Sequence, residues 1–378
     1  MKRKIGEFIK EYSVRNTADE DIPVYSVTNE NGFCTGYFSK DVSSKDRTTY
    51  KIVPRGCFAY NPSRINVGSI DWQNCDNRVI VSPLYVVFEV SDELDRQYLL
   101  HYLKSDVANA FIRANGAGSV RDNLRFKALS DIPIQMVPVE EQREIVKKID
   151  NVSNLIRKGE TIIEELDQLV KSRFVEMFGD PIENPMGWNT KPLLSLGKCK
   201  NGMNFHYDEE GVTINCLGVG EFKDNSIISD TGSLPVITLN EMPSDEYLLK
   251  NDDIVFVRSN GNKALVGRSV AVYPGEIPTT FSGFCIRYRI DDHAITVPYL
   301  LRVLKSESVR KKMAGRGANI QNLNQQTLGT VTVPIPPMDL QMQFSNFMAQ
   351  TDKSKLAVQK ELQKLEILKK SLMQQYFG

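Results

Sequence analysis

The sequence contains no run of about 18 apolar residues, and no apolar stretch follows its MKRK start. The first absence argues against a membrane-spanning helix, and the second argues against a secretory signal peptide. Basic and acidic residues balance at 47 each, so net charge gives no general argument for a nucleic-acid partner. We therefore expect a cytoplasmic protein with no membrane association, whose function must be sought in particular segments.

Signatures of catalysis and metal binding are also missing. The six cysteines form no C-x-x-C pair and only three histidines are present, so we predict buried free thiols and no metal site. No glycine-rich loop suited to a methyl-donor cofactor occurs, and no Walker-type lysine loop occurs. The sequence thus offers no catalytic residue.

A heptad pattern is the main positive feature, in residues 138–179. Ten positions follow one another at steps of four and three, and eight of them are apolar, which predicts a coiled-coil helix of roughly 57 Å. Its other faces are polar, so it needs a partner helix. The ten positions are Ile145, Ile149, Val152, Ile156, Gly159, Ile163, Leu166, Val170, Arg173 and Met177.

The partner helix is a second copy of the same segment. A shift of 199 residues places residues 337–378 over the first copy without a gap, so that Gln142 meets Gln341 and Phe178 meets Phe377. The second stripe is interrupted by polar residues at several positions. It consists of Phe344, Met348, Thr351, Lys355, Val358, Leu362, Leu365, Lys369, Leu372 and Tyr376.

The globular parts repeat in the same order, with short strands, a helix, a glycine-containing loop and a last strand before each long helix. One such helix is predicted from Asp95 to about Asn115, with the apolar residues Leu99, Leu103, Val107 and Phe111 on one face at steps of four. The linker 179–188 is too short for parallel pairing of the long helices, so we predict antiparallel packing. The predicted fold is α+β: two mixed α/β domains with twisted sheets (residues 1–137 and 180–336) and two long antiparallel coiled-coil helices (138–179 and 337–378), related by a pseudo-twofold internal repeat.

Two loops carry side chains suited to nucleic acid. In NPSRINVGS, Asn61, Arg64, Asn66 and Ser69 could bond to phosphates or base edges, and a polar surface turn without a partner is the alternative. Arg64 stands where an aromatic residue would complete the motif by which amino-methyltransferases hold a flipped base. The segment RSNGNKALVGRS contains basic residues and no acidic residue, so it could bind the phosphates or bases of nucleic acid. The alternative is a solvated hairpin tip without a partner. Its candidate residues are Arg258, Asn260, Asn262, Lys263 and Arg268.

A third candidate site follows the equivalent helix in each half. The glycines there could allow close approach to a phosphate, although they are also ordinary signals for a helix end. The same basic loop in both halves carries more weight than the glycines. Its candidate residues are Arg121, Asn123 and Arg125 in the first half and Arg316, Asn319 and Gln321 in the second.

Together these segments resemble a known family. The junction GDPIENPMGW after the first long helix, the prolines before each long helix, the two loops above and the repeated plan of domain and helix are similar to the specificity subunit of type I restriction-modification systems. The resemblance spans the full chain. Because the recognition domains of this family vary strongly, the loops identify the family but not the DNA sequence.

The resemblance implies a non-catalytic subunit that binds double-stranded DNA. Each domain would be a target-recognition domain for one half of a bipartite, asymmetric site. The antiparallel helices would set the gap between the halves and dock two modification subunits, which would hold S-adenosylmethionine, and through them restriction subunits. The alternatives are a self-contained methyltransferase or nuclease, which lacks a catalytic motif here, and a coiled-coil adaptor without a DNA role, which the zero net charge favours.

Overall fold

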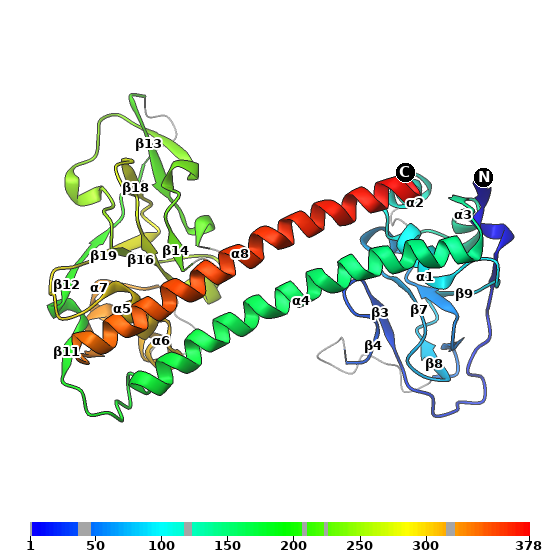
Figure 1. The fold of residues 1–378 in the computed structure, drawn as a ribbon, viewed down its shortest axis with the longest axis horizontal. Coiled ribbons are helices and arrows are strands. Elements are labelled where there is room, and N and C mark those ends of the chain that lie inside the picture. The colour runs from blue at the N-terminus through cyan, green and yellow to red at the C-terminus, as the bar shows by residue number, and fades with distance from the viewer. Residues whose placement is uncertain (1, 37–46, 117–122, 206–209, 223–225, 315–321) are drawn as a thin grey trace. The chain divides into compact units, whose positions relative to one another are not determined.

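The computed structural model describes residues 2–36, 47–116, 123–205, 210–222, 226–314 and 322–378 (Figure 1). The chain forms two compact units, each of which joins a globular domain to parts of two long helices. Unit 1 comprises Met1–Thr161 and Gln359–Gly378, and unit 2 comprises Ile162–Val358. Among the described helices, none is both long enough and apolar enough to cross a membrane.

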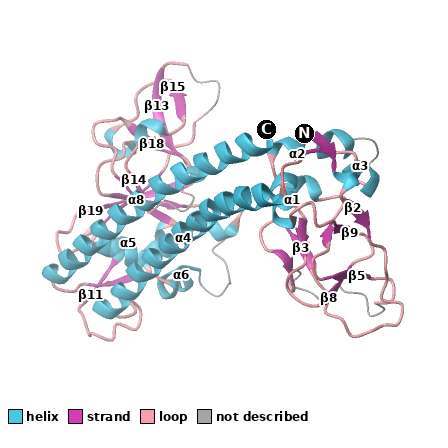
Figure 2. Ribbon diagram, turned by 45° about the vertical axis from the view of Figure 1, so that its right-hand side comes forward, coloured by secondary structure: helices cyan, strands magenta, loops and turns pink. Residues whose placement is uncertain are grey.

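The strands of the domain in unit 1 are short and pair antiparallel (Figure 2). The strands are β1 (Lys2–Lys4), β2 (Ile9–Glu11), β3 (Ser26–Thr28), β4 (Gly32–Cys34), β5 (Lys51–Pro54), β6 (Phe58–Tyr60), β7 (Ile70–Trp72), β8 (Arg78–Val81), β9 (Val86–Val90) and β10 (Pro133–Gln135). The helices are α1 (Arg96–Leu103), α2 (Asp106–Gly116) and α3 (Phe126–Ser130). The largest sheet has the strand order β2-β9-β6-β7, while β3 pairs with β4 and β5 pairs with β8.

Unit 2 repeats this plan with larger sheets. Its strands are β11 (Thr190–Pro192), β12 (Gly197–Asn201), β13 (Val212–Leu217), β14 (Ile227–Ile228), β15 (Val236–Leu239), β16 (Asp253–Val257), β17 (Ser269–Val272), β18 (Thr279–Phe281), β19 (Cys285–Ile290) and β20 (Thr332–Pro334). Its helices are α5 (Val297–Lys305), α6 (Glu307–Ala314) and α7 (Gln325–Gly329). One sheet has the order β12-β19-β16-β17-β14, and the other has the order β15-β13-β18.

Both domains are closed by the same pair of strands. The first strand of each domain pairs antiparallel with the last, as β1 with β10 and β11 with β20. Lys2 lies opposite Gln135 in one pair, and Thr190 lies opposite Pro334 in the other. Each closing pair therefore brings the two ends of a domain together at the point where a long helix begins.

The helix predicted from Asp95 to about Asn115 is wrong as a single element. The structure has two helices, α1 and α2, with a break at Ser105, whose hydroxyl accepts a hydrogen bond from the backbone N–H of Ala108 at 3.2 Å. Serine favours this capping position over a helix interior. The break turns α2 away from the predicted face, so Phe111 is 39% exposed. Ser306 caps α6 in the same way, through the N–H of Val309.

The two long helices are α4 (Val139–Phe178) and α8 (Met338–Phe377), with 40 residues each. All predicted stripe positions on both helices are buried or half-buried. Within unit 1, Gly159 faces Leu362, and a Cβ at Gly159 would lie 2.6 Å from a Leu362 methyl carbon, which explains a glycine in the stripe. Within unit 2, the ammonium of Lys355 lies 2.7 Å from a carboxylate oxygen of Asp167. In unit 1 the ammonium of Lys148 also donates to the hydroxyl of Tyr376 at 3.2 Å, and in unit 2 the rings of Phe174 and Phe344 lie 5.4 Å apart. In each unit the residue numbers of the two pairs rise along α4 and fall along α8, so the helices pack antiparallel within each unit.

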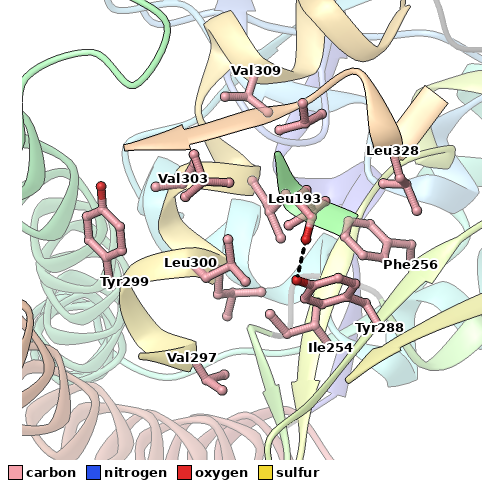
Figure 3. Close-up of a cluster of buried hydrophobic side chains, with 14 of the residues drawn as sticks. Leu193, Ile254, Phe256, Tyr288, Val297, Tyr299, Leu300, Val303, Val309 and Leu328 are labelled. Carbon is pink, nitrogen blue, oxygen red and sulfur yellow. Dashed lines mark hydrogen bonds between the residues drawn. The ribbon is translucent and has the colours of Figure 1, made fainter. Parts of the chain in front are cut away.

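The end of a long helix enters the core of each domain. In unit 1 the ring of Phe377 lies 5.1 Å from that of Tyr98, and in unit 2 the ring of Phe178 lies 4.8 Å from that of Tyr299. Figure 3 shows the unit 2 cluster, in which the hydroxyl of Tyr288 donates to the backbone carbonyl of Leu193 at 2.7 Å. Aromatic rings at such distances pack favourably beyond their buried area.

Candidate nucleic-acid interface

The first candidate loop is the tip of a β-hairpin in unit 1. Strands β6 and β7 pair antiparallel with Phe58 opposite Trp72, and residues 61–69 connect them. The side-chain oxygen of Asn61 accepts the backbone N–H of Ser63 at 3.1 Å and so forms the first turn of the loop. Gly68 closes the loop with a φ of +87°, a conformation that glycine adopts without strain.

The second candidate loop is the tip of the equivalent hairpin in unit 2. It connects β16 and β17, and the side-chain oxygen of Asn260 accepts the N–H of Asn262 at 2.7 Å, as Asn61 does in unit 1. Asn260 lies 199 residues after Asn61, and Gly267 lies 199 residues after Gly68. The shift that aligns the long helices therefore also aligns these two loops, an equivalence that their different residues hide in the sequence.

In each unit, the residues of the third candidate segment that the structure describes are hydrogen-bonded to the hairpin loop of the same unit. The N–H of Leu124 donates to the carbonyl of Pro62 at 3.1 Å, and the N–H of Leu323 donates to the carbonyl of Arg258 at 2.8 Å. In unit 1, the hydroxyl of Ser63 also donates to the side-chain oxygen of Asn123 at 2.5 Å. Asn123 and Arg125 are exposed beside the first loop. Arg121, Arg316, Asn319 and Gln321 lie outside the described residues.

The candidate side chains of the first loop differ in what they can offer a ligand. Arg64 is exposed and Asn66 is half-buried. Ser69 is only 5% exposed, and its hydroxyl donates to the carbonyl of Val27 at 2.6 Å, so it faces the protein. The side-chain oxygen of Asn61 shapes the loop, and the same side chain also forms a hydrogen bond with Tyr85.

A pocket of about 490 Å³ lies beside the first loop and adds residues that sequence reasoning missed. The turn between β3 and β4 contributes Asn29 and Glu30, and Tyr85 directly precedes β9. Burial raises the pKa of Tyr85, so its hydroxyl stays protonated at neutral pH. No local sequence signal marks these residues, because packing between distant segments brings them to the loop. The pocket is lined by Ser26, Val27, Thr28, Asn29, Glu30, Asn61, Arg64, Val67, Ser69 and Tyr85.

The second loop is fixed to the turn before β19. The guanidinium of Arg258 donates to the carbonyl of Gly283 at 3.3 Å, and its backbone N–H donates to the carbonyl of Phe284 at 2.7 Å. Phe284 is 62% exposed beside this loop. It lies 199 residues after Tyr85, so each loop has an aromatic neighbour at the equivalent place.

Basic side chains gather at the second loop. Arg268 is half-buried and Asn262 is exposed, while the structure does not describe the side chain of Lys263. The guanidinium of Arg310 from α6 donates to the carbonyl of Val266 at 3.3 Å. Burial and the neighbouring charge of Arg268 lower the pKa of Arg310. The loop therefore presents hydrogen-bond donors and positive charge, which suit phosphates and base edges.

The cysteine prediction holds for some thiols and is wrong for others. All six are free; Cys57, Cys216 and Cys285 are buried, Cys34 and Cys199 are half-buried, and Cys75 is exposed. Burial raises the pKa of Cys57 to about 11 and that of Cys285 to about 12, so these thiols stay protonated at neutral pH. Within the part of the chain that the structure describes, no cluster of three or more histidine, cysteine or acidic residues could hold a metal ion.

Comparison with known proteins decides the family. The sequence matches the family described as "Type I restriction modification DNA specificity domain" over residues 3–168 and again over residues 185–367. The chain belongs to this family. Each match covers one domain and most of the long helix after it, so the internal repeat is two copies of the specificity domain. The resemblance predicted from the sequence is confirmed.

Named relatives agree with this assignment. The chain is 24% identical over 304 residues to the type I restriction enzyme StySPI specificity subunit of Salmonella potsdam, covering 74% of this chain and 64% of that protein. It is 24% identical over 316 residues to the MjaVIII specificity subunit of Methanocaldococcus jannaschii, covering 78% and 72%. This chain therefore spans slightly under two thirds of the length of the StySPI subunit.

Solved structures share the fold over the full chain. The type I restriction-modification S subunit of M. genitalium is 18% identical, with a TM-score of 0.58 and coverage of 100% of this chain and 96% of that one. A chain from a study of complex assembly and conformational transition of the type I R-M system is 16% identical, with a TM-score of 0.61 and coverage of 100% and 97%. These likenesses confirm the predicted fold class of two mixed domains with long antiparallel helices.

Proposed function

We propose that this chain is the sequence-specific DNA-recognition subunit of a type I restriction-modification complex, in which each domain recognises one half of a bipartite, asymmetric site. The observation that carries this proposal is the equivalence of the two hairpin loops. Both have the same asparagine turn and closing glycine, but Arg64 and Asn66 stand in one loop where other residues stand in the second. A shared framework with different side chains is what two unlike half-sites require.

The chemistry of the loops suits the edges of bases. Arginine pairs with guanine through two hydrogen bonds, asparagine pairs with adenine, and a glutamate such as Glu30 can accept from the amino group of cytosine. Arg64 and Glu30 line one pocket, so together they complement a G·C pair. Each correct pairing should contribute about 1–3 kcal/mol of discrimination.

The long helices support a second part of the proposal, in which they set the gap and dock two modification subunits. Leu155, Ile162 and Leu169 are exposed on α4 at intervals of seven residues, outside the stripe that faces α8. An apolar row at this spacing suits a further helix from a partner. The modification subunits would hold S-adenosylmethionine and recruit restriction subunits, and this chain would be non-catalytic and cytoplasmic.

Selection from random DNA tests this proposal. The full chain, together with its modification subunits, is mixed with a library of random duplexes, and bound molecules are sequenced at several salt concentrations. We expect two short defined blocks separated by unspecified positions, with affinity that falls as salt rises. Binding without any enriched sequence, or no binding, would support a coiled-coil adaptor instead. Methyl transfer by the isolated chain would support an enzyme.

A further inference from the structure

A buried glutamine connects the start of α4 to the domain of unit 1. Gln142 lies in the first turn of α4 and is 0% exposed. Its side-chain oxygen accepts the N–H of Asp95, the capping residue of α1, at 2.7 Å. Its amide group donates to the carbonyls of Glu93 at 3.0 Å and Val137 at 2.8 Å. One side chain of α4 thus binds two residues that precede α1 and one residue that follows β10.

The same connection occurs in unit 2. Gln341 is 0% exposed in the first turn of α8, and its side-chain oxygen accepts the N–H of Thr296, the capping residue of α5, at 2.9 Å. Its amide donates to the carbonyls of Ala294 and Pro336, both at 2.9 Å. Two occurrences in one chain, with the same three kinds of bond in each, show that the contact belongs to the repeated plan and not to one local sequence.

A second repeated bond strengthens each junction. The hydroxyl of Tyr98 donates to the carbonyl of Gln135 at 2.9 Å, and the hydroxyl of Tyr299 donates to the carbonyl of Pro334 at 3.0 Å. The tyrosines therefore tie α1 and α5 to the last strand of each domain. With the glutamine in place, the capping turn, the last strand and the long helix have fixed positions relative to one another within a unit.

We propose that Gln142 and Gln341 are positioning residues that fix the angle between each recognition domain and its long helix, and thereby the length and phase of the gap that the subunit accepts in DNA. The inference rests on the proposed function. Methionine, which fills a similar volume but forms none of these bonds, would leave one N–H and two carbonyls unpaired in a buried place. The domain could then rotate about its closing strands, and several gap lengths would fit.

The test compares gap selection by the parent, Gln142→Met, Gln341→Met and the control Gln343→Met, whose glutamine is exposed on α8. Each full chain, with its modification subunits, is offered duplexes that carry both selected half-sites at every gap length. We expect the preference for the best gap over gaps one base pair longer or shorter to fall by about fivefold or more in the two buried variants. The control should match the parent, and the bases selected in each half-site should stay unchanged.

A purely structural role predicts a different pattern. It would lower the melting temperature and the affinity for every duplex by one common factor, and leave the gap ratio at the parental value; that result would overturn the inference. If the methionine variants do not fold, Gln142→Asn and Gln341→Asn, which shorten the side chain by one methylene, decide the question by the same ratio. A parent that selects no gap at all would contradict the proposed function and not the role of the glutamines.

Discussion

Phe284 exposes a large apolar ring beside the basic loop of unit 2, and the loop holds it in place through hydrogen bonds to its backbone. Phenylalanine can contact the methyl group of thymine in the major groove. We predict that Phe284→Ala lowers affinity for the selected site by about fivefold, because roughly 1 kcal/mol of apolar contact is lost.

Substituting uracil for thymine in the duplex checks this contact. Uracil lacks only the methyl group, so the parent should lose affinity at one thymine position, whereas Phe284→Ala should bind both duplexes equally. Leu194, another exposed apolar residue of unit 2, provides a control as Leu194→Ala. A parent that binds every uracil-substituted duplex as well as the original would refute the methyl contact.

Lys305 makes stability depend on pH. Its ammonium donates to the hydroxyl of Ser226 at 2.8 Å, but burial, followed by the charge of Arg302, lowers its pKa from 10.5 to about 8. In the unfolded chain the lysine keeps its ordinary pKa of 10.5, so folding disfavours its charged form. The resulting loss of stability is complete below pH 8 and disappears as the pH rises to about 10.5. Lys305→Met should therefore stabilise the protein at pH 7 by about 1–2 kcal/mol.

Chemical denaturation of parent and Lys305→Met at pH 7 and pH 10 measures this effect. The advantage of the variant should be largest at pH 7 and should shrink at pH 10, because the parent lysine is then mostly neutral when folded. Comparing the two proteins at each pH cancels the other groups that titrate in this range. If the variant is more stable than the parent by the same amount at both pH values, the charge of Lys305 does not destabilise the protein.

At the scale of elements, the contact between Gly159 and Leu362 tests how α4 and α8 pair in unit 1. A leucine at Gly159 would overlap Leu362, so Gly159→Leu should destabilise the protein by about 1–3 kcal/mol. Adding Leu362→Ala should restore much of this loss, since the space is then vacated by the neighbour. Thermal melts of the two single variants and the double variant give the coupling energy. Simple additivity of the two losses would mean that these residues do not face each other.

The long helices could be predicted from the sequence because their signal is local and periodic. Ile145 and the positions that follow it mark the buried stripe directly, and the copy 199 residues later confirms the period. The break at Ser105 was missed because the apolar spacing continues through it, while the capping bond that ends the helix depends on one hydroxyl. Local periodicity therefore predicts where helices form, but it does not predict where a helix is broken, as at Ser105.

The candidate site could be predicted only in part. Arg64 and Arg258 were found from loop composition, but the equivalence of their hairpins was hidden because the residues after Asn61 and Asn260 differ. Glu30 reaches the same pocket from the turn between β3 and β4, through packing between segments about 30 residues apart, which no local pattern encodes. Ser69 fitted the composition of a binding loop, and only its bond to Val27 shows that it faces the protein.

At the scale of the whole molecule, the helices should act as a ruler between the two half-sites. Inserting seven residues after Gly159 and seven after Val358 keeps the buried stripe on the same face within about 20°. Each helix then grows by roughly 10 Å, which is about three base-pair steps of DNA. Those steps also turn the second half-site by about 100°, given about 10.5 base pairs per turn. We expect a gap longer by one to three base pairs and a loss of affinity.

Selection from a library of gap lengths, performed on the parent and the extended chain, measures this change. An insertion of the same seven residues into an exposed turn, after Gly187, controls for added length without a longer helix. If parent and extended chain select the same gap with equal affinity, the helices do not set the spacing, and their role is limited to binding partners.

The central claim is that the two units recognise separate half-sites through equivalent loops, and single substitutions in each loop test it most directly. The measurement is base selection from a random library by the parent, Arg64→Ala, Arg258→Ala and the control Arg143→Ala, whose arginine is exposed on α4 and pairs with Glu140. Arg64→Ala should relax one position in one half-site, and Arg258→Ala should relax one position in the other, each with a loss of about 1–3 kcal/mol. Relaxation of both half-sites by either variant, or an equal loss across all sequences, would contradict the account.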